Sequence, residues 1–294
     1  MQVLIIGCGD IGRRIATRHL AHGDSVTGLV RQEETAKMLD AAGIHPLLAD
    51  LDDHKIPLPA LQADTVYVLT PPPLTGRDDP RCVAMLGRLA NTPPGHLVYI
   101  SSTAVYGNSQ GATVDETTPP APVSDRGHRR LAAEHAIFEF ARTHQCSATI
   151  LRVAAIYGPG RLPLKRLVQE LPVLDPSESG PGNRIHADDL ADLCVTAACT
   201  PNGQRIYNVS DNNPLSQADY LDLLADLAQL PRPPRMTLRE AEQTLSDKQL
   251  EFLRERRHVD ATHILQELNA VLRYADLADG LRASLAEEQQ NSLQ

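Results

Sequence analysis

A glycine-rich turn near the N-terminus constrains the fold of this chain more than any other feature. In VLIIGCGDIGRRIATRHLAHG, Gly7, Gly9 and Gly12 follow a short apolar run and precede an amphipathic stretch. With this spacing the first glycine permits a tight turn, the second lets a diphosphate approach the backbone, and the third lets helix and strand pack closely. The N–H groups of Asp10 and Ile11 would then face phosphate at the helix start. We predict a dinucleotide-binding unit; the alternative is a turn that serves packing alone.

Short aliphatic runs alternate with amphipathic stretches of helical length as far as Asp211. Continuous apolar strands that alternate with helices are typical of a parallel sheet covered on both faces. The predicted fold class is therefore α/β, a doubly wound parallel sheet of the Rossmann type. Strands are expected at Val3–Ile6, Ser25–Val30, Thr65–Leu69, His96–Ser101, Ala148–Val153 and Arg205–Val209, and helices at Ile11–His22, Glu33–Ala42, Pro80–Asn91, Ser124–His144 and Ala187–Thr200.

The pattern changes after Asp211, where only helical spacing follows. Helices are expected at Ser216–Gln229, Leu238–Leu245 and Asp260–Leu272, and a stretch rich in proline and glycine, Gly158–Gly182, interrupts the strand–helix units before them. We predict a dinucleotide-binding domain over residues 1–157, to which 184–211 return. A smaller, mainly helical cap over 212–294 would hold the substrate, and 158–183 would contribute to it.

Composition and charge exclude several classes of function. A net charge of −9 argues against a general nucleic-acid binder, which needs a basic face. No apolar run approaches the roughly 18 residues of a membrane span, and the N-terminus lacks the basic start of a signal peptide. The five cysteines are odd in number and lack CxxC spacing, which favours reduced thiols over disulfides or a metal site. We expect a cytoplasmic protein without metal that acts on a small molecule.

The end of the second expected strand indicates which cofactor the loop would hold. Sites selective for NAD place a carboxylate there for the ribose 2′-hydroxyl, whereas this chain has Val30 and Arg31, with no acid before Glu33. A guanidinium suits the 2′-phosphate, so NADP(H) is favoured over NAD(H). The alternative is that Arg31 is simply an exposed loop residue. Asp50, after the third strand, could accept a hydrogen bond from the adenine amino group.

Four further motifs resemble those of one enzyme family. They are VYISSTAVYG at Val98–Gly107, LRVAAIYGPGR at Leu151–Arg161, RIHADDLADLCVTAA at Arg184–Ala198 and YNVSDNNPLSQADYLDLLADL at Tyr207–Leu227. Together with the glycine loop they cover nearly the whole chain in the family's order. The chain resembles the extended short-chain dehydrogenase/reductases, the NAD-dependent epimerase/dehydratase family, although most members space their loop glycines GxxGxxG.

The resemblance implies roles for several residues. Ser102 matches the family's catalytic serine or threonine, and Thr70 lies at the strand end where the family's backbone borders the cofactor. His186 and Asp188 resemble the family's helix cap, with the carboxylate satisfying helix-start N–H groups. The expected helices Pro80–Asn91 and Ser124–His144 are the pair through which family members often dimerise, and their apolar residues allow a homodimer.

The chain departs from the family at its catalytic pair. Aligned on LAAE, Arg126 replaces the family tyrosine that transfers the hydroxyl proton, and Arg130 replaces the lysine that lowers its pKa and holds the nicotinamide ribose. Arginine cannot act as an acid or base at neutral pH, because its pKa lies above about 12. The two arginines are four apart and share a helical face. We expect Arg130 to hold the cofactor and Arg126 to face an anionic substrate.

Two hypotheses about function follow. The first is an NADP(H)-dependent oxidoreductase or epimerase/dehydratase-like enzyme for a small polar substrate, with an anionic group as one option. Its catalytic candidates are Ser102, Tyr106, Arg126 and Arg130, and Tyr106 is either a substitute acid or a ring packed at the strand end. The second is a non-catalytic NAD(P)-binding sensor or scaffold. The candidate cofactor residues are Gly7, Gly9, Asp10, Ile11, Gly12, Arg31, Asp50, Thr70 and Arg130.

Overall fold

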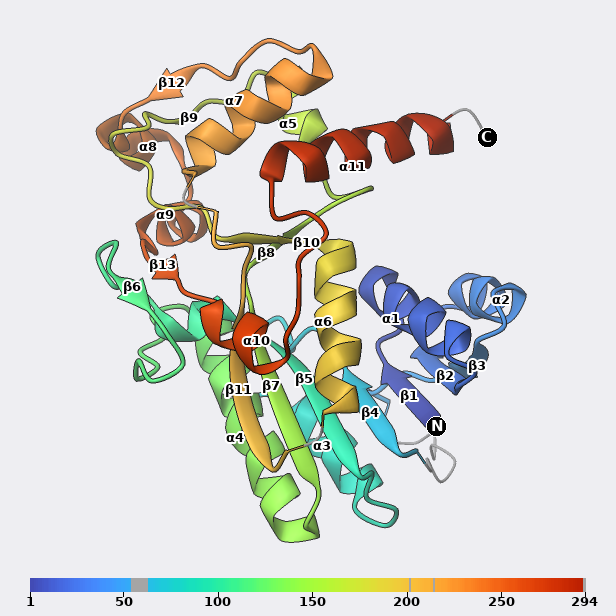
Figure 1. The fold of residues 1–294 in the computed structure, drawn as a ribbon. Coiled ribbons are helices and arrows are strands. Elements are labelled where there is room, and N and C mark those ends of the chain that lie inside the picture. Colours follow the sequence, from blue (N-terminus) through green and yellow to red (C-terminus); the bar gives the residue numbers. More distant parts are fainter. Residues whose placement is uncertain (54–62, 201, 214, 293–294) are drawn as a thin grey trace.

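The predicted doubly wound parallel sheet is confirmed. The computed structural model describes residues 1–53, 63–200, 202–213 and 215–292 (Figure 1). Within these ranges the central sheet has seven strands in the order β11-β7-β5-β4-β1-β2-β3, and every neighbouring pair is parallel. The strands are β1 (Gln2–Ile6), β2 (Ser25–Val30), β3 (His45–Leu48), β4 (Thr65–Val68), β5 (His96–Ser102), β7 (Ser147–Val153) and β11 (Gln204–Val209).

Helices cover both faces of this sheet, as its continuous apolar strands require. Along β1, Val3 and Ile5 pack in one core cluster and Leu4 and Ile6 in the other, because successive side chains of a strand point to opposite faces. Figure 1 shows α1 and α6 on one side and α3 and α4 on the other. The flanking helices are α1 (Asp10–Ala21), α2 (Glu33–Ala41), α3 (Pro80–Leu89), α4 (Asp125–His144) and α6 (Ala187–Cys199).

A second, smaller body of helices and two short strands lies above the sheet (Figure 1). Its apolar cluster joins Tyr157 and Leu167 to Leu221 and Leu281, so segments far apart in the sequence share one core. Strand β9 pairs with β12 in parallel, which places part of 158–183 beside the later helices. The elements are α5 (Leu164–Val168), β9 (Val173–Leu174), α7 (Gln217–Ala228), β12 (Arg235–Met236), α8 (Leu238–Thr244), α9 (Asp247–Arg254) and α11 (Leu277–Ser292).

Local capping explains where the helices of this upper body begin. The hydroxyl of Ser216 accepts from the backbone N–H of Asp219, whose carboxylate accepts from the Ser216 N–H, and Thr237 and Glu240 repeat the arrangement at α8. Such reciprocal capping satisfies two otherwise unpaired donors. The expected helix at Asp260–Leu272 is shorter, α10 (Thr262–Glu267), and packs on β11 rather than in the upper body.

The remaining elements connect the sheet to the upper body. They are the 3-10 helix η1 (Thr103–Tyr106) and the short strands β6 (Thr113–Val114), β8 (Ala155–Tyr157), β10 (Arg184–His186) and β13 (His258–Val259). Strand β10 pairs with β8, and β13 pairs with β6. No helix in the described ranges has the length and apolarity needed to cross a membrane.

Candidate functional site

The three glycines of the loop have the geometries that a phosphate-binding turn requires. Gly7 has φ +88, and a Cβ there would lie 2.9 Å from the Thr70 backbone nitrogen. A Cβ on Gly12 would lie 3.1 Å from Ile5, so the small residue lets α1 pack closely on β1. A Cβ on Gly9 would meet nothing within 4 Å, because that position faces open space. The loop therefore offers room for a ligand above Gly9, whereas Gly7 and Gly12 are closely packed.

A pocket of about 280 Å³ opens beside this loop. It lies at the carboxyl ends of β1, β2, β3 and β4, which is where open parallel sheets bind nucleotides. The pocket brings together Gly7, Gly9, Arg31, Asp50 and Thr70 of the expected cofactor residues. Its lining is Gly7, Cys8, Gly9, Leu29, Val30, Arg31, Gln32, Thr35, Asp50, Leu51, Thr70, Pro71 and Arg81.

Arg31 and Asp50 face this pocket from different strand ends. Arg31 is exposed, and it forms neither an ion pair nor a hydrogen bond with the residues that the structure describes. Its guanidinium is therefore free to pair with a phosphate. Asp50 is half-buried, and one of its carboxylate oxygens accepts from the backbone N–H of Asp52 at 3.0 Å.

Arg130 reaches from α4 to the ends of β4 and β5. Its guanidinium donates to the Tyr99 hydroxyl at 2.9 Å and the Ile100 carbonyl at 3.0 Å, with a longer contact of 3.5 Å to the Thr70 carbonyl. The side chain is buried, yet its Nε has no hydrogen-bond partner in the described part of the chain. Arg130 is therefore a buried cation with an unpaired donor and contacts Thr70, which lines the pocket; this fits a nearby anionic or hydroxylated ligand.

Arg126, one helical turn earlier, is exposed at the start of α4. It makes no hydrogen bond or ion pair with any described residue. The surrounding protein removes part of its hydration and Arg130 adds a like charge; both lower the pKa of Arg126, and only Glu255 acts the other way. The two arginines are therefore close enough to interact, as their spacing predicts, and the site carries positive charge without a carboxylate bonded to it.

Ser102 and Tyr106 lie on the same loop but differ in what their hydroxyls do. Ser102 caps η1, where its Oγ accepts from the Ala104 N–H at 3.3 Å, so its O–H remains available as a donor. The Tyr106 ring is buried; its hydroxyl donates to Asn208 Oδ1 at 2.7 Å and accepts from Arg152 at 3.0 Å. This is the geometry of a ring packed at the strand end.

A buried ion pair lies beneath this loop. Arg152 of β7 donates to the Glu134 carboxylate, with the shortest contact at 2.8 Å, and Ser101 donates to the same carboxylate at 2.5 Å. Both charged side chains are almost fully buried. The glutamate of LAAE thus fixes α4 against β5 and β7, which sets the positions of Ser102 and Arg126 relative to each other.

The upper body contributes residues that sequence reasoning missed. Arg257, before β13, donates to the Gly107 carbonyl at 2.6 Å and pairs with Glu255 at 3.0 Å. The charge of Glu255 opposes the lowering of the Arg126 pKa described above. Arg257 and Glu255 therefore lie near the end of η1 and near Arg126. Nothing in the charged stretch LRERRH distinguishes them from an ordinary solvated surface.

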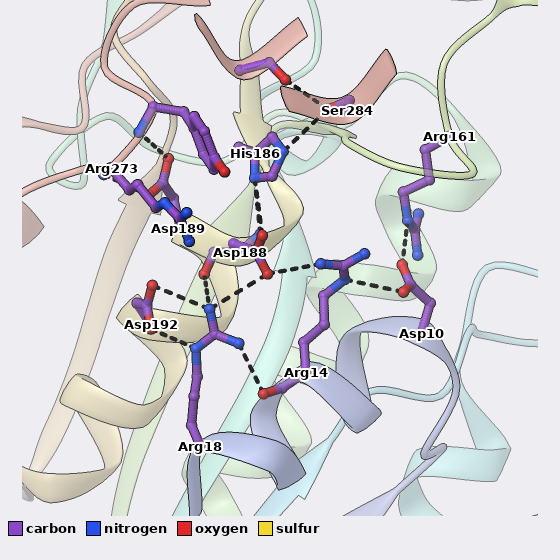
Figure 2. Close-up of polar contacts among 12 residues, drawn as sticks. Asp10, Arg14, Arg18, Arg161, His186, Asp188, Asp189, Asp192, Arg273 and Ser284 are labelled. Atoms are coloured by element: carbon purple, nitrogen blue, oxygen red, sulfur yellow. Dashed lines mark hydrogen bonds and ion pairs between the residues drawn. The ribbon is translucent and has the colours of Figure 1, made fainter. Parts of the chain in front are cut away.

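A network of charges joins α1 to α6 below the upper body (Figure 2). Arg14 pairs with Asp188 at 2.7 Å, and Arg18 pairs with Asp192. The expected helix cap is present with a different acceptor: the His186 ring, rather than the Asp188 carboxylate, accepts from the Asp188 N–H at 3.1 Å. The carboxylate is drawn away by the arginines of α1, which is why the expectation for it was wrong.

Comparison with known proteins agrees with this geometry. Protein YeeZ of Escherichia coli (strain K12) is 29% identical over 221 residues, which cover 71% of this chain and 77% of that protein. A solved structure of a functionally unknown conserved protein from Silicibacter pomeroyi has 29% identity and a TM-score of 0.84, over 97% of this chain and 98% of its own. UDP-glucuronic acid 4-epimerase from Bacillus cereus, solved in complex with NAD, shares the fold at 18% identity and a TM-score of 0.78, over 99% of each chain.

The sequence profile of one family covers most of the chain, from residue 3 to residue 210. The matched region contains the glycine loop, the pocket at the strand ends and the whole of α4. The chain belongs to the NAD dependent epimerase/dehydratase family.

Proposed function

We propose that this protein binds a nicotinamide dinucleotide, NADP(H) in preference to NAD(H), and acts on a small polar substrate with an anionic group. The observation that carries the proposal is Arg126, an exposed guanidinium close to Arg130 that forms neither a hydrogen bond nor an ion pair with the described residues. The arginines that act on Arg126 (Arg129, Arg130 and Arg257) outnumber the carboxylate of Glu255, and a site with net positive charge favours a carboxylate or phosphate.

The residues present fit such a cofactor. The open space above Gly9 would admit the diphosphate, and the N–H groups of Asp10 and Ile11 begin α1 at the same place. Arg31 would pair with the 2′-phosphate, and its lack of an acidic partner is what favours NADP(H). The Bacillus cereus epimerase, which shares this fold, was solved with NAD, so the proposed preference for NADP(H) rests on Arg31.

Arg126 and Ser102 would carry the chemistry on the substrate side. When bound, the nicotinamide ring would give or take a hydride at a substrate carbon. Arg126 would stabilise the negative charge on the oxygen of that carbon, and the Ser102 O–H would donate a hydrogen bond to it. Neither residue releases a proton near neutral pH, and the Tyr106 hydroxyl is already bonded on both sides, so water would exchange the proton.

The second candidate is a non-catalytic sensor or scaffold that binds the same dinucleotide. It is favoured by one observation, the absence of an acid at position 126, since a proton relay typically contributes about 10²–10⁴ in rate. Single-turnover consumption of NADPH in the presence of α-keto acids and sugar phosphates distinguishes the two. Turnover lost in Arg126→Met supports the enzyme, and tight cofactor binding without turnover of any compound supports the sensor.

Cofactor preference tests the proposal first. Calorimetric titration should show NADPH binding several-fold more tightly than NADH, and Arg31→Ala should remove the difference. Arg205→Ala is a matched control, because that arginine lies on β11 and pairs with Glu267. Equal affinities for the two cofactors, unchanged in Arg31→Ala, contradict the assignment to NADP(H).

The location and assembly of the protein are further parts of the proposal. All five cysteines are free, which fits a reducing cytoplasm. A homodimer through α3 and α4 would cover exposed apolar side chains beside them, Val83 and Leu74. Sedimentation of the wild type and of Val83→Asp tests the dimer; a monomeric wild type contradicts it.

A further inference from the structure

The loop after β8 reaches across to the glycine loop. Arg161 Nε donates to the carboxylate of Asp10 at 2.7 Å, although the two residues are 151 positions apart (Figure 2). Asp10 is the first residue of α1 and follows Gly9, the position that faces open space. This contact therefore brings a cation from the far half of the chain to the edge of the proposed diphosphate site.

The same loop is held from above by the last helix. The Gly160 N–H donates to Glu288 of α11 at 2.7 Å, and the Arg161 N–H donates to the Gly158 carbonyl at 3.0 Å. Gly160 adopts φ +74, a conformation that glycine tolerates better than other residues. Arg161 and its neighbour thus connect α11 directly to the first turn of α1.

The charges around Asp10 show which arginine is available to a ligand. Arg14 lies between two carboxylates, 3.1 Å from Asp10 and 2.7 Å from Asp188. Arg161 has Asp10 as its one ion-pair partner among the described residues, and its side chain is 34% exposed. Although burial opposes ionisation, Arg161 and Arg14 hold the pKa of the Asp10 carboxyl below its usual range. Asp10 is therefore an anion beside a site meant for an anionic diphosphate, and Arg161 is the cation that both could share.

We propose that Arg161 is shared between Asp10 and the cofactor diphosphate, and that it couples cofactor binding to the position of α11. The inference rests on the proposed function, because it requires a dinucleotide at the glycine loop. Binding would draw Arg161 toward the diphosphate, and Gly160 would transmit the change to Glu288. The class of ligand recognised is a diphosphate ester, with Arg161 as a positioning residue rather than a catalytic one.

The proposal predicts opposite effects for the two partners of the pair. Arg161→Met removes a cation and should weaken NADPH binding by roughly two- to five-fold, the range for a partly exposed ion pair. Asp10→Asn keeps the backbone N–H but releases Arg161, so NADPH should bind more tightly by about the same factor. In the double variant the gain from Asp10→Asn should disappear. A purely structural tie would predict no gain in Asp10→Asn.

Calorimetry with two ligands and one control variant separates these outcomes. Adenosine 2′-monophosphate lacks the diphosphate, so its affinity should be equal in the wild type and in Arg161→Met. Arg282→Met is the control, because it removes an exposed arginine of α11 whose partner is Asp279, 2.8 Å away. Hydrogen exchange should show NADPH protecting the amides of 158–164 and 277–292 in the wild type, and protecting only the glycine loop in Arg161→Met.

The failures are distinguishable. If the wild type binds neither NADPH nor NADH, the proposed function is overturned and the inference falls with it. If NADPH binds the wild type but binds Arg161→Met equally well, or binds Asp10→Asn more weakly, the inference alone is overturned. Protection of α11 that persists in Arg161→Met also overturns the coupling.

Discussion

Removing the carboxylate of the buried Glu134–Arg152 pair should destabilise the protein far more than removing the carboxylate of an exposed pair on the same helix. Both side chains are 2–3% exposed, and Arg152 makes three contacts of 2.8–3.2 Å with the carboxylate. Removing the carboxylate in Glu134→Ala leaves a buried guanidinium whose remaining hydrogen-bond partner, in the part of the chain that the structure describes, is the Tyr106 hydroxyl. Breaking one side of a buried ion pair costs about 3–5 kcal/mol in the free energy of unfolding. That is a large fraction of the roughly 5–15 kcal/mol that stabilises a typical domain.

Helix α4 provides a matched control. Glu139 pairs with Arg142 at 2.6 Å, but both side chains are more than half exposed, at 63% and 71%. Glu139→Ala should therefore cost at most about 1 kcal/mol. Urea unfolding followed by circular dichroism measures both variants. Equal losses in the two would refute the reasoning, because they would mean that burial of the Glu134 pair has no effect on its contribution.

Three other predictions concern the glycine loop, the two arginines of α4 and the buried His186. Gly9→Val should abolish NADPH binding without loss of melting temperature, because its side chain would enter open space; a folded variant that binds normally contradicts the position of the diphosphate. Restoring the family pair with Arg126→Tyr and Arg130→Lys should give no carbonyl reductase activity in an NADPH-oxidation assay, because the variant loses the two guanidinium groups that would hold the native ligand; a gain of activity contradicts this. Burial lowers the pKa of His186 to about 4, so the unfolded chain takes up its proton first, and stability should fall by up to roughly 3 kcal/mol as the pH drops from about 6.5 to 4. Urea unfolding against pH checks this, and an equal slope in His186→Gln contradicts it.

Much of the sheet could be predicted because its signals are local. Each strand of the sheet except β3 coincides with one of the apolar runs in the sequence. Helices α1, α4 and α6 begin and end within a few residues of their expected bounds. The glycine loop was equally readable, since Gly7 and Gly12 are constrained by contacts with their own strand–helix unit and the strand beside it. Helix α11 was not predicted. Its sequence, LADGLRASLAEEQQNS, contains a glycine and ends in a run of polar residues, which is also typical of a frayed tail. Its buried contacts are with Tyr157 and α7, far away in the chain.

The site was predicted only in part, because its decisive contacts are non-local. The spacing of Arg126 and Arg130 was enough to predict that both arginines lie on one helical face. It could not predict that neither would pair with a carboxylate of the described residues. Whether Tyr106 is free depends on Arg152 and Asn208, which belong to other strands. The pairing of Arg161 with Asp10 has no periodicity that a sequence could reveal.

We propose a dinucleotide site in which Arg126 and Arg130, at the positions of the family's catalytic tyrosine and lysine, bind an anion. One crystal structure tests this most directly. Crystals grown with NADPH and soaked in bromide would locate both ligands, the second by its anomalous scattering. We predict the diphosphate above Gly9, the 2′-phosphate at Arg31, and a bromide ion bonded to the Arg126 guanidinium. A dinucleotide elsewhere, or bromide bound at exposed arginines such as Arg232 but not at Arg126, would contradict the account.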